Sequence, residues 1–265
     1  MRPGTRPGTH PAMRAIALLL ALAAPARAAE RVVSLNLCTD QMLVLLAPEK
    51  VAGLTPLARD PALSYVAAQA AGLPVVRPSA EAVLGRRPDL VLATSFAAQT
   101  TLALLEQSGL TVLRVGLPAD FPVIRAQTRH LAAALGVAER GEALIARMDA
   151  TLALAAPRLP PVRAVLWGAR GYAAGPGTLG DAVLRAAGLE DAGAGGRLDL
   201  EALVAHPPDL LVVPTAPRFP SLATALLDHP ATSGITRVAI PPALLICGGP
   251  FTARAVRLLA EPPGR

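Results

Sequence analysis

Short apolar runs alternate along the chain with longer segments in which apolar residues recur at helical spacing. The runs predict buried β-strands, and the segments between them predict amphipathic helices. Such an alternation is typical of an α/β fold in which helices cover parallel sheets. The strands expected from this pattern are residues 32–35, 75–76, 90–92, 112–115, 164–167, 210–213 and 244–246.

One stretch of sequence occurs twice, 120 residues apart. Residues 81–92 read Glu-Ala-Val-Leu-Gly-Arg-Arg-Pro-Asp-Leu-Val-Leu, and residues 201–212 read Glu-Ala-Leu-Val-Ala-His-Pro-Pro-Asp-Leu-Leu-Val. Each copy predicts a short helix that opens with a glutamate, a proline that ends it, and a strand that begins after an aspartate. The repeat indicates two related α/β lobes, although this local arrangement is also common within a single α/β domain.

Two consecutive helices are predicted between the two copies. The first is expected from Phe121 to Leu135 and, after Gly136, the second from Val137 to Ala155. About 20 helical residues would span roughly 30 Å, which is long enough to connect two lobes. The predicted division is a signal peptide at 1–28, an N-terminal α/β lobe at 29–120, linking helices at 121–157 and a C-terminal α/β lobe at 158–265.

The first 28 residues predict a secretory signal peptide. They contain four arginines and no acidic residue, and Arg14 precedes the ten apolar residues 15–24. Small residues at Ala26 and Ala28 match the spacing that a signal peptidase reads, so cleavage is expected after Ala28; Met13 is an alternative start. Ten apolar residues are too few to span a bilayer. We therefore expect a protein exported to the periplasm.

The charge distribution argues against a nucleic-acid-binding protein. The chain has 25 basic and 19 acidic residues, but the four arginines of the leader leave a net charge of only +2 on the rest. Nucleic-acid binding needs a basic cluster, which the remainder lacks. An exported enzyme using Ser34, Asp40 and Asp60 is an alternative, but none of the G-x-S-x-G, H-E-x-x-H or phosphate-loop motifs is present. We expect a binding protein that is not an enzyme.

Two facing lobes would leave a crevice beyond the carboxyl ends of their strands, where open parallel sheets bind ligands. Trp167, Tyr172 and Phe251 belong to segments that would line this crevice, and aromatic rings offer a ligand rigid contact area. Core packing is the alternative for these rings. Arg59 and Arg170 could donate hydrogen bonds to a ligand or be ordinary solvated loop residues.

Cys38 and Cys247 each follow a predicted strand, one in each lobe. Two buried or partly buried thiols are the expected state, and a disulfide or ligation of a soft metal are the alternatives. Beyond the leader, the histidines are His130, His206 and His229, none at metal-ligand spacing. We therefore expect no metal site and no cofactor.

Several of these features together resemble one family. They are the run from Arg31 to Asn36, the Glu-x6-Pro-Asp-Leu unit in both halves, the long central helix, Gly-Pro-Gly-Thr at 175–178 and Cys-Gly-Gly-Pro-Phe at 247–251. The sequence resembles the periplasmic substrate-binding proteins of ABC importers for iron–siderophore complexes and vitamin B12. The resemblance implies the class III, chelatase-like architecture, with two similar α/β lobes joined by a long inter-lobe helix.

The resemblance also implies a function. A monomer would capture a metal chelate, either cobalamin or a ferric siderophore, between its lobes and deliver it to an ABC permease in the inner membrane. A haem-binding protein of the same type is the alternative. The residues expected to contact the ligand are Cys38, Thr39, Asp40, Arg59, Trp167, Tyr172, Cys247 and Phe251.

In that family a glutamate on each lobe docks onto arginines of the permease, and Glu81 and Glu201 occupy the matching positions. Carboxylates on the first turns of two equivalent helices would give a bivalent anionic surface suited to pairing with two arginines. Alternatively, each glutamate only complements its helix N-terminus, which contributes about 0.3 to 1 kcal/mol.

Overall fold

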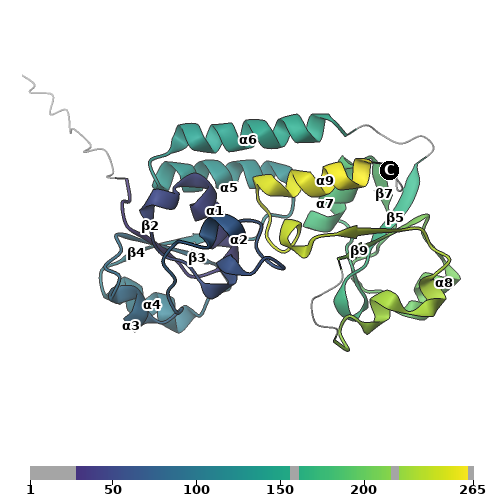
Figure 1. The fold of residues 1–265 in the computed structure, drawn as a ribbon, viewed down its shortest axis with the longest axis horizontal. Coiled ribbons are helices and arrows are strands. Elements are labelled where there is room, and N and C mark those ends of the chain that lie inside the picture. Colours follow the sequence, from purple (N-terminus) through teal and green to yellow (C-terminus); the bar gives the residue numbers. More distant parts are fainter. Residues whose placement is uncertain (1–27, 156–160, 216–220, 262–265) are drawn as a thin grey trace, which may run out of the picture.

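The longer strands form two separate parallel sheets, one at each end of the molecule (Figure 1). The computed structural model describes residues 28–155, 161–215 and 221–261. The first sheet has the order β2-β1-β3-β4 and the second the order β10-β9-β5-β7. Their strands are β1 (Val32–Ser34), β2 (Val51–Gly53), β3 (Leu90–Thr94), β4 (Thr111–Val115), β5 (Val162–Leu166), β7 (Leu189–Asp191), β9 (Leu210–Pro214) and β10 (Arg237–Ile240).

Helices cover both faces of each sheet. The N-terminal lobe contains α1 (Leu37–Leu46), α2 (Ala67–Ala70), α3 (Ala80–Leu84) and α4 (Gln99–Gln107), and the C-terminal lobe contains α7 (Leu179–Ala186), α8 (Leu200–Ala205) and α9 (Ala253–Ala260). A short antiparallel pair, β6 (Tyr172–Ala173) and β8 (Gly196–Arg197), lies beside the second sheet. The α/β class with parallel sheets, predicted from the alternation of apolar runs, is confirmed.

Successive residues of the central strands point into different cores, as the two-residue period of a strand requires. In β3, Leu90 and Leu92 pack with α1 and α5 (Phe121–Ala134), whereas Val91 packs with α3 and α4. In β9, Leu210 and Val212 pack with α7 and α9, whereas Leu211 packs with α8. The two lobes are thus built on the same plan, with a short helix after each repeat glutamate covering the equivalent face.

The repeated aspartates make the same hydrogen bonds in both lobes. The Asp89 carboxylate accepts from the backbone N–H of Arg31 at 3.0 Å, and the Asp89 N–H donates to the Arg31 carbonyl at 2.9 Å. Asp209 makes both bonds to Arg163, each at 2.9 Å. The buried and exposed positions also follow the same order in 81–90 and 201–210. The Pro-Asp-Leu unit therefore fixes each central strand to the start of its neighbour.

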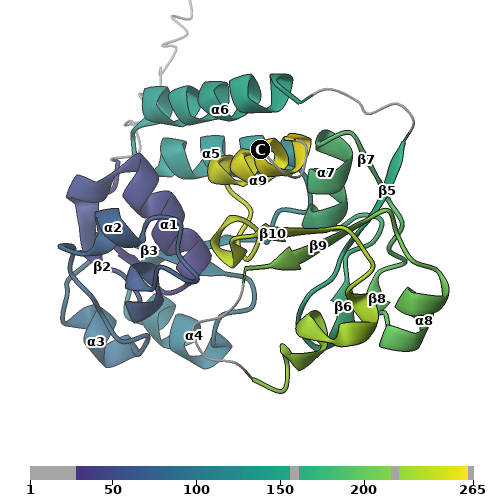
Figure 2. The same cartoon turned by 45° about the vertical axis from the view of Figure 1, so that its right-hand side comes forward.

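The predicted pair of linking helices is present as α5 and α6 (Ala138–Ala153). Gly136 separates them with a φ of +69°, a conformation that favours glycine. At Gly141 of α6 a Cβ atom would lie 2.6 Å from the Cβ of Ala132 in α5, so the close approach of the helices requires a residue without a side chain. Both helices run along the side of the molecule that faces away from α3 and α8 (Figures 1 and 2).

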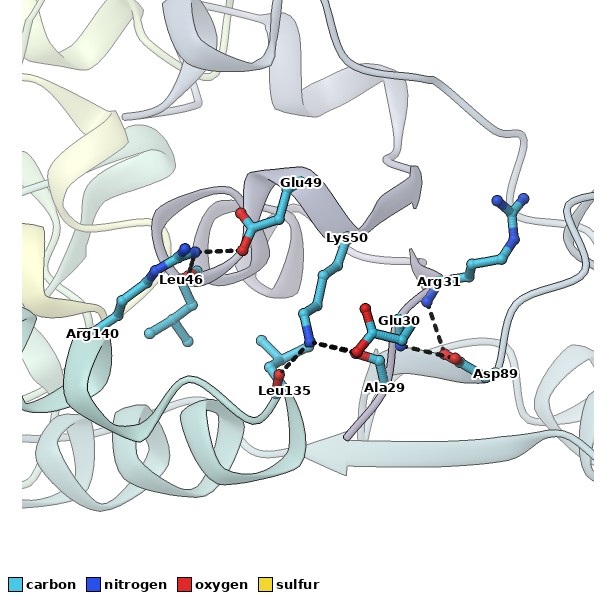
Figure 3. A network of polar contacts seen from close by, with 9 residues as sticks. All are labelled: Ala29, Glu30, Arg31, Leu46, Glu49, Lys50, Asp89, Leu135 and Arg140. Atoms are coloured by element: carbon cyan, nitrogen blue, oxygen red, sulfur yellow. Dashed lines mark hydrogen bonds and ion pairs between the residues drawn. The ribbon is translucent and has the colours of Figure 1, made fainter. Parts of the chain in front are cut away.

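Two basic side chains fasten the turn between α5 and α6 to the N-terminal lobe (Figure 3). The Lys50 ammonium group donates to the carbonyls of Ala29 and Leu135, both at 2.8 Å. Arg140 donates to the Leu46 carbonyl at 3.0 Å and pairs with Glu49 at 2.5 Å. Carbonyl groups at the ends of α1 and α5, which lack partners within their own helices, are satisfied in this way.

The predicted strands differ from the observed ones in two places. Residues 244–246 were expected to be a strand, but the segment belongs to a 3-10 helix at Pro242–Leu244 and a following loop. Residues 75–76 contribute only an isolated bridge between Val75 and Leu54. The predicted signal peptide lies outside the described residues except for Ala28. No helix among the described residues is long and apolar enough to cross a membrane.

Candidate ligand-binding site

A cavity of about 1180 Å³ lies where the two lobes meet. The C-terminal lobe contributes the last residue of β5, the end of β9, the last residue of β10 and the segments that follow them, as expected for a ligand site in a parallel α/β sheet. The N-terminal lobe contributes residues 60–63. The lining residues are Asp60, Pro61, Ala62, Leu63, Leu166, Gly168, Ala169, Val212, Val213, Pro214, Thr215, Thr224, Ile240, Pro241, Pro242, Leu245 and Ile246.

The cavity lining is chemically simple. Most of its side chains are aliphatic or proline, the hydroxyls are those of Thr215 and Thr224, and Asp60 is the charged group among the described lining residues. The Asp60 carboxylate accepts a hydrogen bond from the N–H of Ala62 at 2.9 Å, which shapes the segment itself. Described residues include no group of three His, Cys, Asp or Glu side chains that could hold a metal ion. The cavity therefore suits a large ligand with an apolar surface.

Thr39 and Asp40 are buried inside the N-terminal lobe and do not line the cavity. The Asp40 carboxylate accepts from the Thr55 hydroxyl at 2.5 Å and from the Thr55 N–H at 3.2 Å. Burial raises the pKa of Asp40 to about 7, against the lowering effect of the hydrogen bonds from Thr55. Asp40 therefore holds Thr55, from which the segment leading to the cavity starts, rather than presenting its carboxylate to a ligand.

Arg59 is exposed, but its guanidinium group is bound within its own lobe. It donates to the carbonyls of Ala70 and Leu73 at 3.3 and 2.5 Å. These bonds attach the 3-10 helix Pro56–Arg59 to the end of α2. Arg59 is therefore placed next to the cavity segment but is occupied in supporting it.

Trp167 and Tyr172, the two aromatic residues after β5 that were expected to contact a ligand, lie in different environments. Trp167 is fully buried, and its indole N–H donates to the Leu198 carbonyl at 3.1 Å. Its burial conflicts with the prediction that Trp167 contacts a ligand, because core packing and the Leu198 carbonyl already satisfy the whole side chain. Tyr172 is 61% exposed on β6 but does not line the cavity.

Phe251 and the two cysteines lie at the junction of the lobes. Phe251 is 5% exposed and stacks on Tyr65, with ring centroids 4.9 Å apart. Cys38, at the start of α1, forms a disulfide with Cys247, with Cα atoms 5.1 Å apart. The expectation of two free thiols is therefore wrong, because folding brings positions 209 residues apart to bonding distance. A disulfide leaves neither sulfur as a thiol for a ligand.

Glu81 and Glu201 lie in the first turns of α3 and α8, and both side chains are exposed. Ser79 and Asp199 cap these helices by accepting hydrogen bonds from the N–H groups of Ala82 and Ala202. Ser79 and Asp199 therefore satisfy backbone N–H groups at the helix N-termini, so Glu81 and Glu201 are not needed as caps. Helices α3 and α8 lie on the same side of the molecule in both views (Figures 1 and 2).

The model of the periplasmic binding protein family matches residues 32–239. The chain belongs to the periplasmic binding proteins. Members of this family are solute-binding components of ABC importers, so the predicted class of periplasmic substrate-binding proteins, its two-lobed α/β fold and a binding rather than an enzymatic function are confirmed, whereas the vitamin B12 or siderophore type stays a prediction. A search of curated protein sequences finds no significant match.

Solved structures of other periplasmic binding proteins share the fold. The haem-binding protein RhuT from Roseiflexus sp. RS-1 is 25% identical with a TM-score of 0.70, covering 87% of this chain and 98% of its own. A haem-binding protein from Pseudomonas aeruginosa is 26% identical with a TM-score of 0.69, covering 88% and 91%. A possible iron-binding protein from Staphylococcus epidermidis is 15% identical with a TM-score of 0.70, covering 88% and 98%, which shows the fold alone.

Sequence reasoning missed most of the cavity that this periplasmic binding protein contains. The predicted contact residues include Arg59, which precedes the lining residues Asp60 and Pro61, and Trp167, which precedes Gly168, but none of residues 214–215 or 240–246. The signal for residues 214–215 was present, because they follow a predicted strand, and the carboxyl ends of parallel strands form such sites. The second segment was hidden because β10 was not predicted. Tyr65, which stacks on Phe251, carried no recognisable signal.

Proposed function

We propose that the protein captures a metal chelate in the cavity between its lobes and delivers it to an ABC permease. The observation that carries the proposal is the apolar lining at the carboxyl ends of β5, β9 and β10, opposite residues 60–63 of the other lobe. A chelate brings its own metal ligands, so the protein has to supply only shape, apolar contact and a few polar groups. The volume of about 1180 Å³ is slightly above the usual range for small-molecule sites, about 300 to 1,000 Å³, which suits a large ligand.

The lining favours a ligand whose metal is already fully coordinated, such as cobalamin or a ferric siderophore. Haem iron in proteins is held by His, Cys, Met or Tyr side chains. None of these residue types is among the described residues that line the cavity. Haem stays the second candidate, because the structural neighbours with 25 to 26% identity are haem-binding proteins.

Titration of the mature protein with cyanocobalamin, haem and ferric siderophores tests the proposal. Trp167 is the single tryptophan of the chain and directly precedes Gly168, which lines the cavity, so its fluorescence should be quenched on binding. We expect saturable quenching by at least one of these chelates. No response to any of them would contradict the proposed function.

A pair of variants locates the binding site. Ile246 lines the cavity and is 45% exposed, so Ile246→Arg should fold and place a charge against the apolar ligand. Burial of an unpaired polar group costs about 1 to 3 kcal/mol, so we expect an affinity about 5- to 150-fold lower. Val204→Arg, at a 43% exposed position on α8, is the matched control and should bind normally. Equal affinities for both variants would place the ligand elsewhere.

We propose further that Glu81 and Glu201 dock onto arginines of the permease. Their support is threefold: both are exposed, both occupy the same position of the repeat, and neither is needed as a helix cap. A charge-assisted hydrogen bond between a carboxylate and an arginine is about twice as strong as one between neutral groups. The pair therefore forms a bivalent docking surface on the side of α3 and α8.

A further inference from the structure

A second cavity, of about 570 Å³, lies between α6 and α9. It shares no residue with the first cavity. Helix α6 contributes one wall, α9 and the 3-10 helix Pro250–Thr252 contribute another, and Leu45 and Tyr65 of the N-terminal lobe complete it. Because α6 and α9 lie away from α3 and α8 (Figures 1 and 2), the cavity is remote from the proposed docking surface.

Three guanidinium groups line this cavity, those of Arg147, Arg254 and Arg257. No aspartate or glutamate is among its described lining residues, and none of the three arginines forms an ion pair within the described part of the chain. Five other arginines in the described part of the chain do pair with carboxylates, in Arg114–Glu106, Arg125–Asp149, Arg129–Glu142, Arg140–Glu49 and Arg185–Asp181, but none of these pairs lines the cavity. Positive charge therefore accumulates in this cavity without a counter-charge.

The cavity also contains hydrogen-bond donors that can bind a further acceptor. Arg254 uses one of its N–H groups to donate to the Tyr65 hydroxyl oxygen at 3.0 Å, and its guanidinium lies 5.5 Å from the Tyr65 ring centroid. An arginine has five N–H donors, so most of those of Arg254 are left for another acceptor. The Tyr65 hydroxyl, which accepts in this bond, keeps its own proton to donate. The donors surround a space to which the described residues supply no acidic acceptor.

Apart from the Thr151 hydroxyl, which donates to the Arg147 carbonyl at 2.9 Å, the rest of the lining is mainly apolar. The stacked rings of Tyr65 and Phe251 and the side chains of Leu45, Leu144 and Met148 form it. Inorganic phosphate would leave this surface unused, whereas an organic anion could bury an apolar part there and direct its charged group to the arginines. Arginine binds carboxylate and phosphate groups in bidentate geometry, which suits this combination.

We propose that the cavity between α6 and α9 is a second binding site, for a small organic anion with a carboxylate or phosphate group and an apolar part. Its occupant would contact the N-terminal lobe through Tyr65, the linking helix through Arg147 and the C-terminal helix through Arg254 and Arg257. A ligand that binds all three parts in the folded state raises the stability of the protein by mass action. The site is independent of the chelate cavity.

Calorimetric titration with phenyl phosphate and with inorganic phosphate tests the proposal. We expect saturable binding of phenyl phosphate at least tenfold tighter than that of phosphate, together with a rise in the melting temperature. Arg147→Gln and Arg254→Gln should each weaken the binding of phenyl phosphate by about tenfold. Both residues are exposed, so the variants are expected to fold, and their melting temperatures without ligand check this.

Arg77→Gln and Arg197→Gln are the matched controls, since they remove the same charge from exposed positions outside the cavity. They should leave binding unchanged. An equal loss in all four variants would mean a nonspecific effect of net charge and would overturn the proposal, as would the absence of phenyl phosphate binding. Saturation with a chelate should not displace phenyl phosphate, and displacement would show that the two sites are one.

Discussion

Asp40 is a buried carboxyl group in the first turn of α1, within the N-terminal lobe. Its burial raises its pKa to about 7, from an ordinary value of 3.8. A carboxyl whose pKa is higher in the folded state binds its proton more tightly there, so it stabilises the protein most when protonated. The contribution is present in full below about pH 4 and is lost as the pH rises to about 7.

We predict that Asp40→Asn removes this part of the pH dependence. A difference of about three pKa units corresponds to about 4 kcal/mol in the free energy of unfolding, so the wild-type protein should lose up to this amount between pH 4 and pH 7 relative to the variant. Urea unfolding of both proteins across this pH range measures the difference. A difference that is constant or that grows in favour of the wild type with rising pH would contradict the assigned pKa.

At the scale of secondary-structure elements, the disulfide between Cys38 and Cys247 joins the start of α1 to the loop before the 3-10 helix Pro250–Thr252. A second close contact lies beside it: a Cβ atom at Gly248 would come within 2.3 Å of the Pro118 ring, so glycine permits the loop to pass the end of the N-terminal lobe. The lobes are thus connected covalently at a point distant in sequence from α6. The sequence placed each cysteine after a predicted strand, which is correct only for Cys38, and it did not show that the two cysteines meet, because their separation depends on the packing of the two lobes.

Cys38→Ser with Cys247→Ser should lower the free energy of unfolding by about 2 to 5 kcal/mol, because the bond closes a loop of 209 residues in the unfolded chain. Denaturant unfolding with and without a reductant measures this change. The wild-type protein should respond to the reductant and the double variant should not. Equal stability of the oxidised wild type and the variant would show that the bond does not constrain the unfolded chain.

Elements whose sequence signals are local could be predicted, whereas elements that depend on distant contacts could not. The repeat units were predictable because proline, aspartate and the apolar run act on their immediate neighbours. Strand β10 was missed because it begins with Arg237, and residues 238–239, on an edge of the sheet, are only partly buried or exposed. The apolar residues 244–246 were assigned as a strand, although they are apolar because Leu244 is buried and Leu245 and Ile246 line the cavity.

Trp167 illustrates the limit for site residues. An aromatic residue after a strand is a reasonable candidate for ligand contact, but the carbonyl that satisfies its indole N–H belongs to Leu198, 31 residues further along the chain. Thr39 and Asp40 are similar, since their position after β1 is correct for a site and yet their side chains turn into the lobe. The position of a loop could be predicted, whereas the direction of its side chains depends on tertiary packing.

For the whole molecule, the duplication predicts that docking and chelate binding are separable. Glu81→Gln and Glu201→Gln should each lower the affinity for the permease by about tenfold, the effect of losing one charged hydrogen bond. Chelate binding should be unchanged, because neither residue lines the cavity. Pull-down with the membrane permease measures docking, and growth with the chelate as the supplied nutrient measures uptake.

Glu139→Gln is the control for docking, because Glu139 is also an exposed glutamate in a first turn, but on α6, which faces away from α3 and α8. It should behave as the wild type. An equal loss for Glu139→Gln, or normal docking of the Glu81→Gln and Glu201→Gln double variant, would contradict the assignment of the docking surface.

A crystal structure of the protein with the chelate that binds in the titration tests the central claim most directly. The account predicts that the chelate lies between residues 60–63 of one lobe and residues 240–246 of the other, with its metal bound by no protein side chain. A chelate bound outside this cavity, or a metal ligated by a residue of the chain, would contradict it.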